Sequence, residues 1–129
     1  LADQVADADL VITGEGRIDS QTIHGKVPVG VAKVAKRFNK PVIGIAGSLT
    51  ADVGVVHDHG IDAVFSVIYT ICSLEDALEN ASENVRMAAR KDASTSSWKN
   101  AKTPSTIRIS WQIATIADSA IRCSKRIDI

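Results

Sequence analysis

Polar and charged side chains gather between Gly14 and Lys26, directly after a short apolar run. The run from Leu10 to Thr13 is bounded by turn-forming residues, which is typical of a strand buried on both faces of a parallel sheet. The following thirteen residues, ending at Lys26, carry two carboxylates, a guanidinium, hydroxyls and an ammonium. Such groups can transfer protons, bind a divalent metal and neutralise phosphate. Because ligands of open α/β sheets collect at the carboxyl ends of the strands, the sequence predicts a ligand site here.

Two common nucleotide-binding motifs do not match this segment. A dinucleotide fingerprint needs a third glycine where Asp19 stands, and an acidic residue about twenty positions further on, where Asn39-Lys40-Pro41 lies. A P-loop needs glycine where Ser20 stands, and Ser or Thr where Val27 follows the Gly25-Lys26 pair. If the segment binds phosphate, it uses neither of these routes.

The string from Gly14 to Asp19, Gly-Glu-Gly-Arg-Ile-Asp, resembles the signature of the type I glycerate kinases, a family that phosphorylates glycerate with ATP. The resemblance extends through Lys40-Pro-Val-Ile-Gly-Ile-Ala-Gly47 and Ser73-Leu-Glu-Asp-Ala-Leu78, and it covers about residues 3 to 92. Members of this family are much longer, with two α/β domains and an active site in the cleft between them. The resemblance implies that this chain corresponds to the C-terminal end of such a kinase, with ATP and Mg²⁺ as cofactors.

We expect Asp19, which resembles the acidic residue of the family's glycine-rich motif, and Lys26 to be the catalytic residues. A carboxylate at Asp19 can accept the proton of the attacking hydroxyl or bind Mg²⁺; the alternative is the N-cap of a helix that opens at Ser20. Lys26 can neutralise a phosphate or the carboxylate of glycerate; the alternative is a solvated lysine.

Contacts to substrate are expected from the residues around these two. Glycine allows positive φ and close backbone approach, so two glycines among polar groups predict a ligand-binding loop rather than a simple tight turn. Arg17 has a planar fork suited to a small carboxylate, although it can pair instead with Glu15 or Asp19. Lone hydroxyls can contact substrate or simply stabilise turns. We expect the substrate site to contain Gly14, Glu15, Gly16, Arg17, Thr22 and Ser48.

Strand and helix signals alternate along the rest of the first 92 residues. Apolar spacing predicts a helix from Pro28 to about Phe38, a strand over 42–46, a short helix over 51–59 and a third strand over 63–68. Ser73 and Asp76 form a capping box for a helix to about residue 91. Its predicted buried stripe is Leu74, Ala77, Leu78, Ala81, Val85 and Ala88. Three strands separated by helices predict a three-layer α/β fold with a parallel, Rossmann-like sheet.

The last segment differs in kind, and we place the boundary at about residue 92. Residues 1–92 carry thirteen acidic and nine basic residues, whereas residues 93–129 carry two and six. Alternation over 107–113 predicts a half-buried strand, followed by helical spacing. The sequence leaves open whether residues 93–129 are a non-native end, produced by read-through or a frame shift, or an extension that covers an open sheet edge.

Composition bounds the class of protein. The chain has 129 residues, is 45% apolar and carries no net charge, so it can bury one modest core. No apolar stretch reaches the roughly eighteen residues of a membrane span, and no secretory leader is expected. Two cysteines, Cys72 and Cys123, favour a reduced cytoplasmic protein. The basic residues after residue 92 are too scattered to predict nucleic-acid binding.

The expected activity is ATP-dependent phosphorylation of D-glycerate to phosphoglycerate. The alternative is a non-catalytic module that binds an anion or packs against a partner subunit. A three-stranded sheet leaves open edges and an uncovered face, so we expect exposed apolar surface, self-association and no activity in the isolated chain. The sequence does not indicate which hydroxyl is phosphorylated or where ATP binds.

Overall fold

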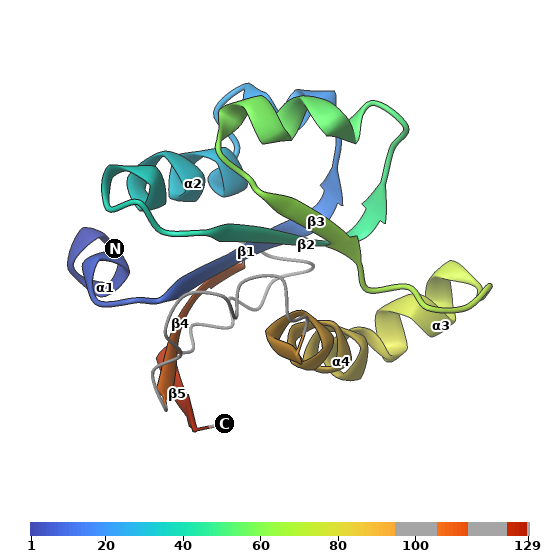
Figure 1. The fold of residues 1–129 in the computed structure, drawn as a ribbon. Helices are drawn as coiled ribbons and strands as arrows, with labels where there is room; N and C mark the ends of the chain where they lie inside the picture. The colour runs from blue at the N-terminus through green and yellow to red at the C-terminus, as the bar shows by residue number, and fades with distance from the viewer. Residues whose placement is uncertain (95–105, 114–123, 129) are drawn as a thin grey trace.

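The computed structural model describes residues 1–94, 106–113 and 124–128 (Figure 1). The elements, in chain order, are α1 (Ala2–Ala6), β1 (Leu10–Ile18), the 3-10 helix η1 (Ser20–Ile23), α2 (Val27–Arg37), β2 (Val42–Leu49), the 3-10 helix η2 (Val53–His59), β3 (Ala63–Ser66), α3 (Leu74–Glu79), α4 (Ala81–Ser94), β4 (Thr106–Ile113) and β5 (Ser124–Asp128).

The strands form one sheet in the order β3-β2-β1-β4-β5. β1 runs parallel to both β2 and β4, β2 runs parallel to β3, and β5 is antiparallel to β4. The α/β class with a parallel sheet is therefore confirmed. β4 also confirms the strand expected over 107–113, and β5 was not anticipated. The helical spacing expected after the strand over 107–113 lies almost entirely outside the described residues.

β4 lies along the edge of β1, with Ile12 opposite Trp111. Whether residues 93–129 are a native extension or a non-native end stays open. The domain boundary at residue 92 stays a prediction, because the position of β4 does not test where one domain would end.

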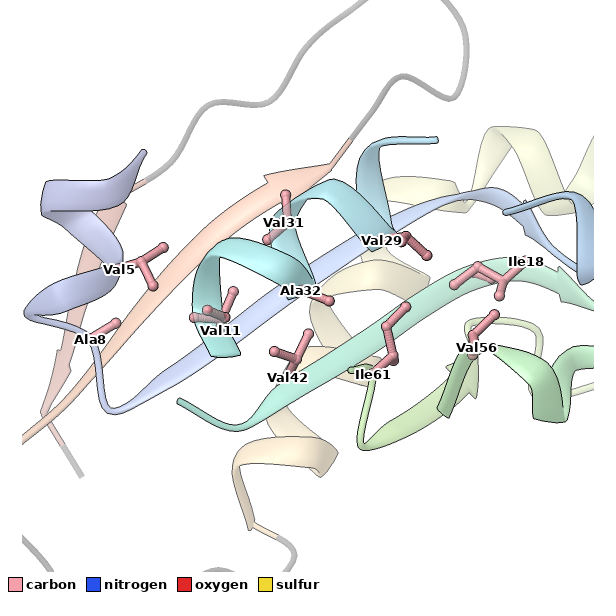
Figure 2. Close-up of a cluster of buried hydrophobic side chains, with 12 residues drawn as sticks. Val5, Ala8, Val11, Ile18, Val29, Val31, Ala32, Val42, Val56 and Ile61 are labelled. Carbon is pink, nitrogen blue, oxygen red and sulfur yellow. The ribbon is translucent and has the colours of Figure 1, made fainter. Parts of the chain in front are cut away.

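Each face of the sheet carries its own core, because side chains alternate across a strand. On one face, Val11 and Val42 pack with Val29 and Ala32 of α2, as Figure 2 shows. On the other face, sheet residues pack against α4, which lies opposite α2 (Figure 1). This second core contains Leu10, Ile12, Ile43, Ile45, Val67 and Ala88. Burying one such aliphatic side chain contributes about 1.5–3 kcal/mol, so both layers stabilise the sheet.

The helix predicted from Pro28 to about Phe38 is confirmed as α2 (Val27–Arg37), and its ends follow familiar rules. Pro28 lies in the first turn, where its missing N–H costs nothing, and Lys36 and Arg37 lie in the last turn, near the negative end of the helix dipole. Asp62 then ties this end to the sheet: its Oδ2 accepts hydrogen bonds from Lys36 Nζ at 2.6 Å and from the Val42 backbone N–H at 2.7 Å.

The glycine loop expected after Thr13 is not present, because β1 continues to Ile18. Neither Gly14 nor Gly16 has a positive φ; among the described glycines only Gly25 and Gly60 do. These strand glycines serve close strand packing instead. A Cβ on Gly14 would lie 2.2 Å from the carbonyl oxygen of Ile45, and a Cβ on Gly47 would lie 2.7 Å from that of Gly16. β2 likewise continues past Ala46 to Leu49, with Gly47 inside the strand.

The long helix expected after Ser73 is divided at Asn80 into α3 and α4. The capping box of Ser73 and Asp76 is confirmed. Asn80 is the C-cap of α3, and both its backbone N–H, at 3.0 Å, and its side-chain Nδ2, at 2.9 Å, donate to the Asp76 carbonyl. The predicted buried stripe is correct for Ala88, but it is wrong for Leu74 and Leu78, which are 76% and 51% exposed.

Candidate active site

The predicted site segment begins in the last residues of β1 and ends where α2 starts, at the carboxyl edge of the parallel sheet (Figure 1). The strand register places Arg17 of β1 opposite Ser48 of β2, so both belong to this edge. Between β1 and α2, the chain turns through η1 and then through Gly25, whose φ of 85° is a left-handed conformation that favours glycine. The fold therefore returns Lys26 toward the end of β1.

Lys26 lies near two carboxylates. Its Nζ is 3.7 Å from Glu15 Oε1 and 3.6 Å from Asp19 Oδ1. Both acidic side chains are only 13% exposed, whereas Lys26 is 41% exposed. The ammonium thus has internal partners and still reaches the surface, where an incoming anion can meet it.

Asp19 makes two internal contacts, one as an N-cap and one as the partner of Arg17. It is the N-cap of η1, and its Oδ1 accepts a hydrogen bond from the Gln21 backbone N–H at 2.9 Å. Its Oδ2 pairs with Arg17 Nε at 3.2 Å. The capping role is confirmed as a structural feature, and Arg17 makes the internal ion pair. Because Arg17 is 63% exposed, its guanidinium also faces water.

Thr22 is fully buried beneath this cluster, and its hydroxyl has two internal partners. Its Oγ1 donates to Glu15 Oε1 at 2.7 Å and accepts from the Asp19 backbone N–H at 3.1 Å. The bond from the Asp19 N–H completes the capping box of η1. A direct contact between Thr22 and substrate stays a prediction that this geometry does not test.

The remaining predicted residues differ in access. Gly14 is buried and pairs on both sides, with Ile45 of β2 and Ile113 of β4. Gly16 and Ser48 are exposed at the end of the sheet. The structure therefore brings Glu15, Arg17, Asp19, Thr22 and Lys26 into one connected cluster, and leaves Gly16 and Ser48 beside it.

Asp52 adds a contact that the sequence analysis did not identify. Hydrogen bonds from Ser20 and Thr50 hold the pKa of the Asp52 carboxyl below its ordinary value, which favours the charged form. Asp52 thereby joins the segment after β2 to η1, next to Asp19. The Thr50-x-Asp52 spacing after a strand is a local turn signal, but the bond from Ser20 depends on the tertiary fold.

The two carboxylates suit a Mg²⁺ ion that takes its other ligands from substrate and water, rather than a metal ion held entirely by protein side chains. In the described part of the chain, no group of three or more His, Cys, Asp and Glu side chains is placed to hold a metal ion. Mg²⁺ is commonly held by one or two carboxylates together with substrate phosphates and water. Glu15 and Asp19, which share Lys26 as a neighbour, fit that pattern.

Comparison with known proteins identifies the family. The model of the glycerate kinase family matches residues 1–97. This chain belongs to the glycerate kinase family. The resemblance carried by the Gly14–Asp19 string is thereby confirmed.

Two bacterial enzymes are among the relatives of this chain. This chain is 64% identical over 95 residues to the glycerate 2-kinase of Escherichia coli K12. The match covers 74% of this chain and 25% of that protein. The chain is 60% identical over 99 residues to the glycerate kinase of Bacillus subtilis 168, covering 77% of this chain and 25% of the relative.

A solved structure named as glycerate kinase 2 of Salmonella typhimurium LT2 is 76% identical, with a TM-score of 0.53. That match covers 73% of this chain and 23% of the other. The chain therefore spans about a quarter of the length of the relatives that it matches. Among the described residues, no helix combines the length and the apolar character needed to cross a bilayer.

Proposed function

We propose that this chain is part of an ATP-dependent kinase that converts D-glycerate to phosphoglycerate, and that it forms one wall of the active site. The observation that carries the proposal is the cluster at the end of β1, where Lys26 lies 3.7 Å and 3.6 Å from two largely buried carboxylates. Membership of the glycerate kinase family supports the choice of reaction.

Phosphoryl transfer asks the protein mainly for positioning and charge neutralisation. A hydroxyl oxygen of glycerate forms a bond to the γ-phosphorus of ATP, while the bond from that phosphorus to the β,γ-bridging oxygen breaks and ADP leaves. Asp19 is proposed to take up the hydroxyl proton. Lys26 neutralises phosphate charge, and the exposed guanidinium of Arg17 binds the glycerate carboxylate.

Glu15 and Asp19 would hold Mg²⁺, which, when bound, neutralises the phosphate oxygens. Gly14, Gly16, Thr22 and Ser48 are proposed to shape the substrate side of the site. We also propose a cytoplasmic location, because the exposed thiol of Cys72 is suited to a reducing compartment.

A chimeric kinase tests this proposal. The matching 95 residues of the Escherichia coli glycerate 2-kinase are replaced by those of this chain. With Mg²⁺, ATP and D-glycerate, the chimera should form ADP and phosphoglycerate at a rate within about tenfold of the parent, because the parent supplies the rest of the cleft. A folded chimera without glycerate-dependent turnover would favour the alternative, a non-catalytic module that binds an anion or packs against a partner.

The isolated chain should show no glycerate phosphorylation and should self-associate. Donor and acceptor must be held in line, and this positioning is worth several kcal/mol that part of a cleft does not supply. Ile71 is fully exposed at 104% and Leu74 is 76% exposed, so apolar surface is available for contact between copies. Light scattering and an ADP-release assay on the purified chain check both points. An active, monodisperse monomer would contradict them.

Lys26→Ala and Arg17→Ala should weaken substrate or nucleotide binding more than they weaken folding. Both side chains are partly exposed, and surface ion pairs contribute only about 0–1 kcal/mol to stability, whereas hydrogen bonds to a charged ligand are stronger. In the chimera we expect KM to rise roughly tenfold for glycerate with Arg17→Ala, and for ATP or glycerate with Lys26→Ala. Lys33→Ala, on the exposed side of α2, is the control. Lower thermal stability with unchanged kinetic constants would refute this role.

A further inference from the structure

Thr22 is an unusual residue at this edge of the sheet, because it is polar and completely buried. Among the described residues, Thr13 and Thr22 are the polar side chains that are fully buried. A buried hydroxyl without partners would cost free energy, so its hydrogen bonds indicate why it is there.

The Thr22 hydroxyl joins the two carboxylate residues of the cluster. It accepts from the Asp19 backbone N–H at 3.1 Å and donates to Glu15 Oε1 at 2.7 Å. Lys26 lies 3.7 Å from the same Glu15 oxygen. Both contacts to Glu15 therefore fall on Oε1, which is held by the buried Thr22 hydroxyl and by the partly exposed Lys26 ammonium.

Asp19 is held in a matching way. Its side chain caps η1 through Oδ1, and Lys26 lies 3.6 Å from that oxygen, while its backbone N–H is bound by Thr22. One hydroxyl thus links the backbone at one carboxylate residue to the side chain of the other. The hydrogen-bond chain sets the separation between the two carboxylates on either side of the Lys26 ammonium.

We propose that Thr22 is a positioning residue of this site, an inference that rests on the kinase function proposed above. It does not need to touch the substrate. It holds Glu15 and Asp19 in one arrangement before ligands arrive, so that Lys26 and the carboxylates meet the phosphates without rearrangement. Because Thr22 is buried, water does not compete for the hydrogen bonds that its hydroxyl makes with Glu15 and Asp19.

Two substitutions in the chimera separate the hydroxyl from the volume that it occupies. Thr22→Val keeps the branched shape and removes both hydrogen bonds, whereas Thr22→Ser keeps the hydroxyl. We expect Thr22→Val to lower kcat roughly tenfold to hundredfold with KM changed less than about threefold, because small displacements of positioned groups act on turnover. Thr22→Ser should restore kcat to within about threefold of the unmodified chimera.

Ile18→Val is the control for packing alone, since Ile18 is a fully buried apolar residue of the neighbouring core. It should lower thermal stability and leave kcat unchanged. If Thr22→Val keeps full kcat, or if Thr22→Ser loses as much as Thr22→Val, the positioning role is wrong. An inactive unmodified chimera would instead overturn the proposed function itself.

Amide hydrogen exchange in the unmodified chain tests the same proposal without a substitution, so the result does not depend on whether a variant folds. The Asp19 backbone N–H should exchange slowly with solvent deuterium, because its acceptor is a buried oxygen. The exposed Gly16 beside it provides a comparison within the same segment. Exchange of the Asp19 amide as fast as that of an exposed residue would overturn the proposal without any substitution.

Discussion

Asp19→Asn in the chimeric kinase should lower turnover by roughly a hundredfold or more, the scale lost when a general base is removed. The substitution removes the charge of Asp19 and keeps its capping role. Asparagine is as good an N-cap as aspartate, so its side-chain oxygen can still accept the hydrogen bond from the Gln21 N–H. Stability should therefore change little while the negative charge beside Arg17 and Lys26 is lost.

The dependence on Mg²⁺ separates the two chemical roles that we propose for Asp19. If Asp19 holds the metal, the variant should need a much higher Mg²⁺ concentration for half-maximal rate. If it acts as the base, that concentration should stay the same while kcat falls. Near-normal turnover at every Mg²⁺ concentration would reduce Asp19 to the cap of η1.

Gly14→Ala should lower the free energy of unfolding by about 2–4 kcal/mol, which is a large part of the stability of a small domain. The new Cβ would lie 2.2 Å from the carbonyl oxygen of Ile45, and this oxygen belongs to the backbone of the neighbouring strand. The clash can be relieved only by moving β1 away from β2. Soluble yield and the midpoint of thermal unfolding of the chain measure the effect.

Gly30→Ala is the matched control for Gly14→Ala. Gly30 lies within α2, and a Cβ there would meet nothing within 4 Å. Alanine should raise stability by about 0.4–1 kcal/mol, because it restricts the unfolded chain and favours the helix. If both alanine variants unfold at the same temperature as the unmodified chain, the close approach of β1 and β2 is not required.

The alternation of strands and helices could be predicted from the sequence because each element has its own periodicity and its own end signals. Pro28 acts locally and lies at the start of α2, where the sequence indicated, and η2 ends at His59, as expected of the short helix over 51–59. The extension of β1 could not be predicted in this way. Gly14 and Gly16 look like loop residues, but in a strand glycine also marks a close approach of another backbone, which depends on the neighbouring strand.

The course of the chain after β3 shows a second limit of local signals. The capping box at Ser73 correctly predicted a helix, but helical spacing did not indicate that this helix ends at Asn80, the C-cap of α3. Apolar spacing also predicted that Leu74 is buried, and this prediction is wrong, because Leu74 is 76% exposed. Spacing identifies an apolar stripe, whereas the surface that covers it depends on tertiary contacts.

The members of the candidate site could be predicted because they are close in sequence and complementary in charge. The sequence already offered Arg17 and Asp19 as an internal pair. The links through Thr22 and Asp52 could not be predicted, since they depend on how η1 folds back beneath the end of β1 and beside the segment after β2. Hydroxyl groups form such bonds in many turns, so their residue type alone does not identify the partner.

The rate of glycerate-dependent ADP formation by the chimeric kinase shows whether this chain supplies a working wall of a glycerate kinase site. We expect a rate within about tenfold of the parent enzyme, and a rate lower by roughly a hundredfold when Asp19→Asn is introduced into the transplanted segment. A folded chimera that binds ATP and D-glycerate but turns over no faster than its Asp19→Asn variant would contradict this expectation.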